Sequence, residues 1–298
     1  CTLAEIGVEG VEIQDHQPLT EEDKAQMFVD IMPEGPADDG IAYLNFYLEE
    51  DADKEIILRD VRNALEELRT FMDIGEATIE ESQTEDKDWI NNWKEFFHQF
   101  YVDDILIVPS WEEVKEEDKD KMILHIDPGT AFGTGMHETT QLVIRQLKKY
   151  VKPGIELLDV GTGSGILGIT ALKLGAGHVV GTDLDPCAVP AVQDNKEANE
   201  IVDETFDMMI GNIIDDKEVQ DQVGYEKYDI VAANILADVL VPLTPVIVHQ
   251  MKKGAYYITS GILDVKEEVV REAVAKAGLT LVEVTRQGEW VCVTARKD

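Results

Sequence analysis

The sequence is poor in basic residues. It has 26 lysines and arginines against 61 aspartates and glutamates, which gives a formal net charge of -35 at pH 7. A protein that binds bare nucleic acid through its phosphates needs clustered lysine and arginine, so direct nucleic-acid binding is not expected. An acidic field favours the approach of a basic partner, but an acidic surface also confers solubility without any specific site.

Cysteine and long apolar runs are also scarce. The three cysteines, Cys1, Cys187 and Cys292, are odd in number and widely spaced, which argues against a disulfide framework and a cysteine-built metal site. We therefore expect no metal. Because no apolar run reaches membrane-spanning length and no secretory leader is visible, we expect a soluble cytosolic protein without a membrane partner. Residues 2–7 resemble the end of a helix, so the natural protein is expected to extend upstream.

What the sequence does contain is a glycine-rich turn, Leu-Asp-Val-Gly-Thr-Gly-Ser-Gly at residues 158–165. Residues 155–160 are predicted as a buried strand and 166–174 as the helix that follows. Asp183 ends the next apolar run, twenty residues after Gly163. Glycines let backbone N–H groups approach a ligand closely, and an acid at that place can accept hydrogen bonds from both hydroxyls of a ribose. The turn therefore predicts a site for a nucleoside cofactor.

Two classes of cofactor share this geometry. Gly163, Gly165 and Gly168 satisfy the spacing of a dinucleotide fingerprint. Asp159, two residues before the first glycine of the turn, favours S-adenosylmethionine. Its carboxylate can hold a cationic amino group but would repel a pyrophosphate. On the turn alone, a nicotinamide oxidoreductase remains the alternative.

Strands and helices alternate from residue 154 onward. We expect parallel strands at residues 155–160, 178–183, 207–211, 228–233 and 254–260. Helical patterns between them predict a sheet that is covered on both faces. The last two runs, 279–286 and 289–295, predict an antiparallel hairpin. Since a dinucleotide fold would carry a second mononucleotide-binding half, the hairpin favours an α/β, Rossmann-like class I methyltransferase domain.

The first part of the chain has a different character. We expect strands there at residues 8–13, 41–48 and 77–82, and one amphipathic helix that begins at residue 53 and is ended by Gly75. These elements predict a small α+β domain, expected to be ferredoxin-like, over residues 1–82.

A linker helix is predicted next, at residues 83–100, with a stripe of aromatic side chains that packs between domains. Residues 101–109 and 121–126 are expected as strands. They open the predicted catalytic domain, residues 101–298.

The segment 127–140 is unusually rich in glycine and threonine for a stretch that precedes a helix. Thr139 or Thr140 is expected to cap that helix. Because no Gly-Lys-Ser or Gly-Lys-Thr signature of a phosphate loop is present, we favour a mobile lid over an anion cradle. His137 is a candidate contact to cofactor or substrate, or else a surface residue of this loop.

Asn234 stands at the carboxyl end of the predicted strand 228–233, the edge at which ligands meet an open parallel sheet. Its amide oxygen can accept a hydrogen bond from an amine and direct the lone pair of that amine toward a sulfonium methyl group. Asn234 is therefore the candidate catalytic residue. Capping of a helix that begins near Ile235 is the competing explanation. Trp290 is a candidate lining residue of an acceptor pocket, or ordinary core.

Three motifs together resemble a known family: Asp-Trp-Ile-Asn-Asn-Trp-Lys at 88–94, the segment 127–140, and Asn-Ile-Leu-Ala at 234–237. Along essentially its whole length the chain is similar to the bacterial ribosomal protein L11 methyltransferases. The resemblance implies transfer of methyl groups from S-adenosylmethionine to lysine ε-amines and the N-terminal α-amine of a basic protein of the large ribosomal subunit. Methylation of another protein or a small molecule, and cofactor binding without turnover, are the competing functions.

The resemblance also implies site residues. Together with Asp159 and Gly163 of the turn, the expected cofactor contacts are Thr140, Gly161, Asp183 and Asn234, with Phe132, Gly133, Thr134 and Gly135 adjacent. The amino-terminal domain is implied to recognise the substrate protein. The first strand and helix of that domain are expected to be missing from this sequence.

Overall fold

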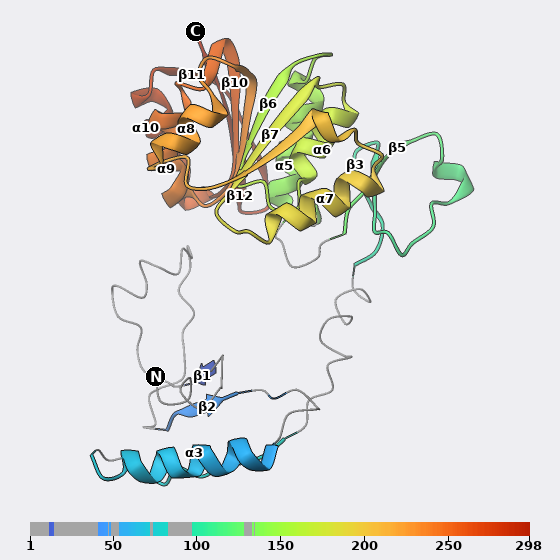
Figure 1. Cartoon of the computed structure of the whole chain (residues 1–298). Helices are drawn as coiled ribbons and strands as arrows, with labels where there is room; N and C mark the ends of the chain where they lie inside the picture. Colours follow the sequence, from blue (N-terminus) through green and yellow to red (C-terminus); the bar gives the residue numbers. More distant parts are fainter. Residues whose placement is uncertain are drawn as a thin grey trace. The chain divides into compact units, whose positions relative to one another are not determined.

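The structure is a computed structural model and describes residues 12–14, 41–46, 48, 54–71, 74–82, 97–127, 133 and 135–298. The chain divides into two compact units, Cys1–Asp88 and Trp89–Asp298 (Figure 1). Of the predicted linker helix at 83–100, residues 83–96 lie outside the described residues. The prediction is wrong for residues 97–100, which are not helical, and Phe100 belongs to a strand.

The amino-terminal unit contains strands and one helix among its described residues: β1 (Glu12–Gln14), β2 (Tyr43–Asn45) and α3 (Lys54–Leu68). β1 and β2 are antiparallel. In α3 the buried residues Leu58, Val61 and Ala64 recur at three-residue spacing and therefore share one face. The predicted α+β content is present in these residues, and a ferredoxin-like topology stays a prediction.

The strand predicted at residues 77–82 is wrong. None of these residues joins a strand. Gly75 and Ala77 have φ angles of +64° and +47°, which an extended strand does not contain. The carbonyl of Glu76 instead accepts a hydrogen bond from the guanidinium of Arg69, so the segment turns back onto the end of α3.

The second unit is built on a seven-stranded sheet with the order β11-β12-β10-β9-β6-β7-β8. Its strands are β6 (Glu156–Val160), β7 (His178–Asp183), β8 (Phe206–Ile210), β9 (Tyr228–Asn234), β10 (Met251–Leu263), β11 (Leu279–Gln287) and β12 (Trp290–Lys297). The pairs β10–β9, β9–β6, β6–β7 and β7–β8 are parallel, whereas β12 is antiparallel to both of its neighbours. The predicted parallel sheet with a closing antiparallel hairpin is confirmed.

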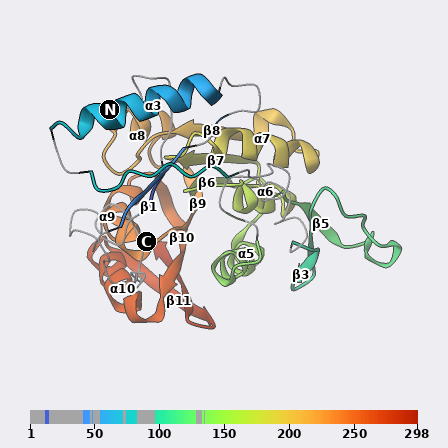
Figure 2. The ribbon, with the colours of Figure 1, turned by 90° about the horizontal axis from the view of Figure 1, so that it is seen from below.

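Helices cover both faces of this sheet (Figure 2). One face carries α5 (Glu138–Tyr150), α6 (Ile166–Lys173) and α7 (Ala188–Ala198). The other carries α8 (Lys217–Val223), α9 (Ala237–Ile247) and α10 (Glu267–Lys276). Among the residues that the structure describes, the short 3₁₀ helices are η2 (Glu116–Asp118), η3 (Asp203–Thr205) and η4 (Asp264–Lys266).

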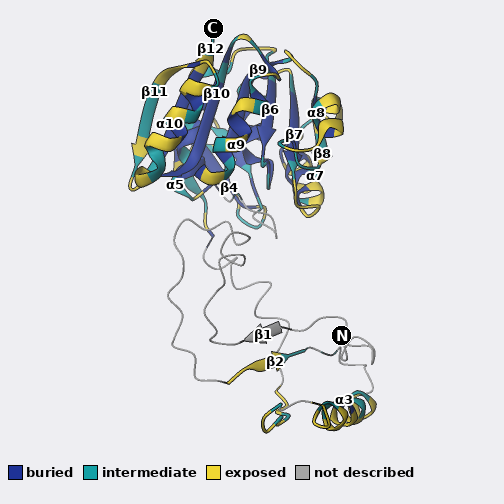
Figure 3. Ribbon diagram, turned by 90° about the vertical axis from the view of Figure 1, so that its left-hand side faces the viewer, coloured by how far each residue is buried: buried dark blue, intermediate teal, exposed yellow. Residues whose placement is uncertain are grey.

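The alternation of side chains along β6 assigns each residue to one face. Leu157 packs into the core beneath α5 and α6, whereas Leu158 and Val160 pack into the core beneath α8 and α9. Asp159 has the parity of Leu157 and therefore points toward α6. The inner strands β6, β7, β9 and β12 are buried along most of their length, whereas the edge strands β8 and β11 and the outer helix faces are largely exposed or half-buried (Figure 3).

A three-stranded sheet precedes the large one: β3 (Phe100–Val102), β4 (Ile105–Val108) and β5 (Met122–His125). The single strand predicted at 101–109 is wrong, because the chain turns at Asp103, whose φ is +55°, and β4 returns antiparallel to β3. The strand predicted at 121–126 is confirmed as β5, which pairs parallel with β4. In the part of the chain that the structure describes, no helix has both the length and the apolar character needed to cross a bilayer.

Gly168, in the first turn of α6, offers a test of how closely helix and sheet pack. A Cβ at this position would lie 2.6 Å from Cε1 of Phe206 and 2.9 Å from Cγ1 of Val179. Exchange of a helical glycine for alanine ordinarily stabilises by about 1 kcal/mol. Here we expect Gly168→Ala to lower the free energy of unfolding by about 1–3 kcal/mol through overpacking, measured by urea denaturation.

The second substitution Phe206→Leu frees space at the same contact and serves as the control. In the Phe206→Leu background, Gly168→Ala should cost less than in the wild type, as a double-mutant cycle would show. Stabilisation by Gly168→Ala alone would contradict the close packing.

Candidate active site

A cavity of about 480 Å³ opens at the carboxyl ends of the parallel strands. It lies where the strand order reverses, between β6 and β9, the place at which open α/β sheets bind their ligands. Its lining residues come from strand ends, the start of α5 and the start of α9: His137, Thr139, Val160, Gly161, Thr182, Asp183, Leu184, Gly211, Asn212, Ile213, Ile214, Asn234, Ile235, Leu236, Val239, Leu243, Gly261 and Trp290.

The predicted site residues divide into three groups. Those that line the cavity are His137, Gly161, Asp183, Asn234 and Trp290. Those that lie near it without lining it are Gly133, Gly135, Thr140, Asp159 and Gly163. Phe132 and Thr134 lie outside the described residues.

The glycine turn brings bare backbone to the cavity. Gly161, Gly163 and Gly165 have φ angles of +71°, +51° and +81°, which residues with a side chain rarely adopt. A Cβ on Gly161 would lie 2.5 Å from Cγ2 of Ile235. Glycine is therefore required at 161 by both conformation and space, and its backbone is what the cavity meets.

Asp183, the last residue of β7, presents a fixed carboxylate to the cavity. Oδ2 accepts a hydrogen bond from the backbone N–H of Gly163 at 2.8 Å, and Oδ1 accepts one from the N–H of Asp185 at 3.0 Å. A carboxylate has about four acceptor positions. The positions that remain can accept hydrogen bonds from two neighbouring hydroxyl groups of a ligand.

Asp159 lies beneath the turn and does not line the cavity. Its carboxyl is fully buried, and Oδ2 accepts hydrogen bonds from Oγ1 of Thr162 at 2.8 Å and from the N–H of Gly168 at 3.1 Å. Burial raises the pKa of Asp159 to about 7. The carboxyl of Asp159 therefore holds the glycine turn to α6. A contact between this carboxyl and an amino group of the cofactor stays a prediction.

Asn234, the last residue of β9, has one half of its amide engaged. Nδ2 donates to Oγ1 of Thr140 at 3.1 Å. Oδ1 is buried and has no hydrogen-bond partner among the described groups. A buried amide oxygen without a partner is costly, so it marks a place where a ligand can donate a hydrogen bond. Helix capping does not explain Asn234, because α9 begins at Ala237 and its N-cap residue is Leu236.

The start of α5 differs from the prediction. The N-cap residue is His137, whose Nδ1 accepts a hydrogen bond from the N–H of Thr139, so the predicted caps Thr139 and Thr140 are wrong. Thr140 is 1% exposed, and its hydroxyl holds Asn234 instead. Both the imidazole of His137 and a threonine hydroxyl can accept the capping hydrogen bond, so the local sequence alone does not determine which residue caps the helix.

Two glycines of the preceding segment pack against the beginning of α6. The carbonyl of Gly133 accepts a hydrogen bond from Oγ of Ser164 at 2.6 Å, and a Cβ on Gly135 would lie 2.7 Å from Cδ1 of Ile166. These contacts bring the segment beside the glycine turn. Residues 128–132 and 134 lie outside the described residues, and a lid function stays a prediction.

Opposite the glycine turn, His137 and Trp290 form an aromatic pair. Their ring centroids are 4.8 Å apart and the planes meet at 68°, an edge-to-face arrangement. Both residues line the cavity together with Asn234. The pair joins the start of α5 to the start of β12.

Several lining residues were not predicted: Leu184, Asn212, Ile213, Ile214, Ile235 and Gly261. All but Gly261 follow a parallel strand directly or closely, so the rule that ligands bind at carboxyl ends could have found them. Gly261 has a separate signal. Its φ is +84°, and a Cβ there would lie 2.4 Å from the carbonyl oxygen of Ile235, so glycine lets β10 approach the end of β9.

Comparisons with known proteins indicate one and the same family along the whole chain. The family model described as "Ribosomal protein L11 methyltransferase (PrmA)" matches residues 1–298. A protein named ribosomal protein L11 methyltransferase from Agathobacter rectalis is 54% identical over 299 residues, which cover 99% of this chain and 93% of the relative. One of the same name from Lachnospira eligens is 56% identical over 296 residues, with the same coverage.

A solved structure agrees with the fold. The crystal structure of ribosomal protein L11 methylase from Lactobacillus delbrueckii subsp. bulgaricus is 31% identical and superposes with a TM-score of 0.61. The match covers 68% of this chain and 100% of that chain.

The buried Asp159 predicts a pH dependence of stability. Its pKa rises on folding from an ordinary value of about 3.9 to about 7. Between these values the folded protein holds a proton that the unfolded chain has released, so this group lowers stability as the pH rises from about 4 to about 7. The size of the rise in pKa corresponds to roughly 4 kcal/mol at most.

The measurement is urea denaturation of the cofactor-free protein from pH 5 to 8, beside Asp159→Asn, which keeps an acceptor oxygen but cannot titrate. The free energy of unfolding of the wild type minus that of the variant should fall as the pH rises and then level off. A difference that stays constant from pH 5 to 8 would mean that Asp159 is already ionised in the folded protein.

Proposed function

The chain belongs to the ribosomal protein L11 methyltransferase family, and on this premise we propose how it works. It transfers methyl groups from S-adenosylmethionine to ribosomal protein L11. We infer that the acceptors are lysine ε-amines and the N-terminal α-amine. The observation that carries this inference is the buried, unpartnered Oδ1 of Asn234, because an amine is a group that can donate a hydrogen bond to it.

The residues of the cavity fit S-adenosylmethionine. Asp183 has free acceptor positions for the two ribose hydroxyls, and the backbone of Gly161, which carries no side chain, lines the cavity. Leu184, Ile213 and Ile214 supply an apolar wall beside Asp183 for the adenine ring. When bound, the cofactor supplies an electrophilic methyl group on a positively charged sulfur.

Asn234 orients the acceptor. The hydroxyl of Thr140 fixes the nitrogen of the amide, so the amide oxygen is the atom left to receive an amine N–H. A hydrogen bond from the amine to Oδ1 restricts the direction of the nitrogen lone pair, and such orientation is a large part of the barrier that an enzyme can remove. Asn234 thus acts as a catalytic residue that touches the attacking nitrogen.

The acceptor amine must lose a proton before it can attack. With a pKa near 10.4, fewer than about one lysine in a thousand is neutral at pH 7. The cavity is lined mainly by apolar side chains, and desolvation in such surroundings lowers the pKa of an amine. We assign no residue of the chain as the proton acceptor.

We further propose that the acidic surface speeds the encounter with the substrate. The net charge of -35 attracts a basic protein at long range. Recognition is assigned to the amino-terminal domain, residues 1–82, joined by a linker at 83–100 to the catalytic domain at 101–298. Because ribosomal proteins act in the cytoplasm, we place the reaction there.

The test of the function is transfer of labelled methyl groups to unmethylated L11, with the sites read by mass spectrometry. We expect label on lysine ε-amines and the α-amine, and Asn234→Ala should lower kcat about 10²-fold, since the amine is no longer oriented. The dissociation constant of S-adenosylmethionine should change less than about threefold, because the other contacts remain.

Two variants control this experiment. Asn234→Asp keeps an acceptor oxygen that Thr140 can bind, so it should retain more activity than Asn234→Ala. Asn212→Ala removes the same side chain from the end of β8 and should raise KM for the cofactor more than it lowers kcat. Transfer to other proteins but not to L11 would identify a different acceptor, and cofactor binding without any transfer would refute the function.

Asp183 should govern cofactor affinity rather than turnover. In Asp183→Asn, one oxygen becomes an N–H₂ group that cannot accept from a ribose hydroxyl and that faces backbone donors. We expect the affinity for S-adenosylmethionine, measured by calorimetry, to fall about 10- to 100-fold, as loss of a hydrogen bond to a charged group implies. Unchanged affinity would exclude Asp183 from the ribose site.

A further inference from the structure

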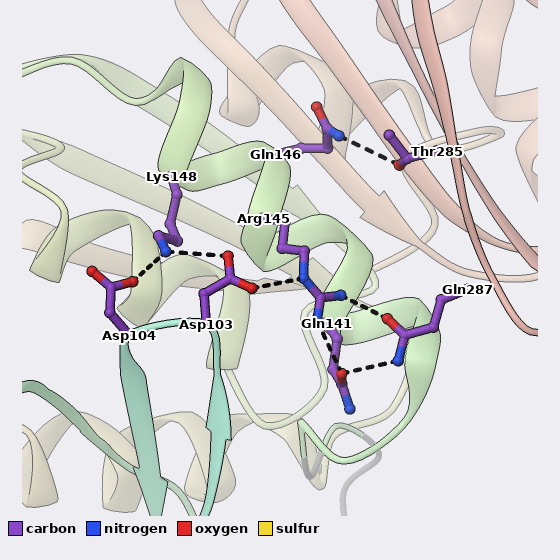
Figure 4. A network of polar contacts seen from close by, with 8 residues as sticks. All are labelled: Asp103, Asp104, Gln141, Arg145, Gln146, Lys148, Thr285 and Gln287. Carbon is purple, nitrogen blue, oxygen red and sulfur yellow. Dashed lines mark hydrogen bonds and ion pairs between the residues drawn. The ribbon is translucent and has the colours of Figure 1, made fainter.

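Several side chains link α5 to the closing hairpin of the sheet, and we call three of them the glutamine relay: Gln141, Arg145 and Gln287 (Figure 4). Nη1 of Arg145 donates to Oε1 of Gln287 at 2.6 Å. Nε2 of Gln287 donates to Oε1 of Gln141 at 3.1 Å. The guanidinium is anchored on its other side by Oδ1 of Asp103, 3.0 Å from Nε.

The charge of Arg145 fixes the direction of the whole relay. A guanidinium only donates, so the amide oxygen of Gln287 must face it and the amide nitrogen must face away. That nitrogen requires the oxygen of Gln141, which leaves the nitrogen of Gln141 to donate to the carbonyl of Met136 at 2.8 Å. Both glutamine amides are therefore held in one orientation.

The two ends of the relay lie next to the two halves of the aromatic pair. Met136 directly precedes His137, and Gln287 is the register partner of Trp290 across the turn of the hairpin. His137 and Trp290 pack edge to face in the cavity wall. The same first turn of α5 also carries Thr140, which holds the amide of Asn234.

The aromatic pair lies on the acceptor side of the cavity. In the strand order, β12 and β10 lie on one side of β9, whereas β6 and β7, which end in Gly161 and Asp183, lie on the other. The backbone at Gly161 and the carboxylate of Asp183 are the proposed cofactor contacts. The wall formed by His137 and Trp290 is therefore left for the group that approaches Asn234.

We propose that Gln141 and Gln287, oriented by Arg145, are positioning residues of the methyl transfer. They set the distance between α5 and the β11–β12 hairpin, and so hold the His137–Trp290 wall and the Thr140 hydroxyl in register with Asn234. This inference rests on the proposed function, since it gives the wall to the acceptor amine.

The central variant is Gln141→Glu, which keeps an acceptor for Gln287 and Arg145 but cannot donate to the carbonyl of Met136. Gln287→Ala removes the relay from its other end and serves as a second variant. Lys148→Ala is the matched control. Lys148 ties the same helix to the same β3–β4 turn through Asp103 and Asp104, but it does not contact either glutamine (Figure 4).

Two readouts apply to the full-length protein. The first is steady-state kinetics with L11, together with the dissociation constant of S-adenosylmethionine. The second is the ¹⁹F resonance of Trp290 in protein labelled with 5-fluorotryptophan, assigned by its loss in Trp290→Phe. We expect both glutamine variants to shift or broaden this resonance and to lower kcat/KM for L11 about tenfold, with cofactor affinity within about twofold. Lys148→Ala should leave all three quantities unchanged.

The positioning role would be overturned if the Trp290 resonance and kcat/KM both stayed at wild-type values in Gln141→Glu and Gln287→Ala. The proposed function would then remain intact. An equal loss of activity in Lys148→Ala would also overturn the positioning role. The activity would then depend on the attachment of α5 to the β3–β4 turn, and not on the two glutamines. A wild-type protein that binds cofactor but methylates no L11 would refute the function itself, and the acceptor role of the wall with it.

Discussion

The reversal of strand order between β6 and β9 is the constraint on which the site depends. The helix after β6 packs on one face of the sheet and the helix after β9 packs on the other. The two connections diverge from neighbouring strand ends, and the crevice between them is the cavity. The glycine turn, the carboxylate of Asp183 and the amide of Asn234 reach one cavity because each ends or follows a strand of the same parallel sheet.

The elements that the sequence predicted correctly are those with a strong local signal. The glycine turn, the alternation of strands and helices and the closing hairpin each follow from the order of apolar residues and glycines within a short window. The errors arose where a single backbone conformation or a distant group determines the structure. The reversal at Asp103 and the loop at 77–82 depend on single backbone conformations, and the position of Asp159 depends on which face of β6 is packed against α6.

The site as described relies on orientation and desolvation more than on strong charges. Asp183 lines the cavity with its carboxylate already engaged by two backbone donors, and Asp159 is buried below the turn. Asn234 is neutral, and its direction is set by Thr140. An amide held in this way can guide a nitrogen nucleophile without competing with it for the proton, which suits an acceptor that must arrive uncharged.

Ile235 lies between two glycines that come from different strands. Its side chain fills the space that a Cβ on Gly161 would need, and its backbone occupies the space that a Cβ on Gly261 would need. These three positions therefore form one steric unit, although about a hundred residues of sequence separate the first from the last. A smaller residue at 235 would relieve the steric conflict at 161, whereas no side chain at 235 can make room at 261. Both glycines also have positive φ angles, +71° and +84°, so neither position accepts a side chain without backbone strain, and redesign of this site has to begin at other residues.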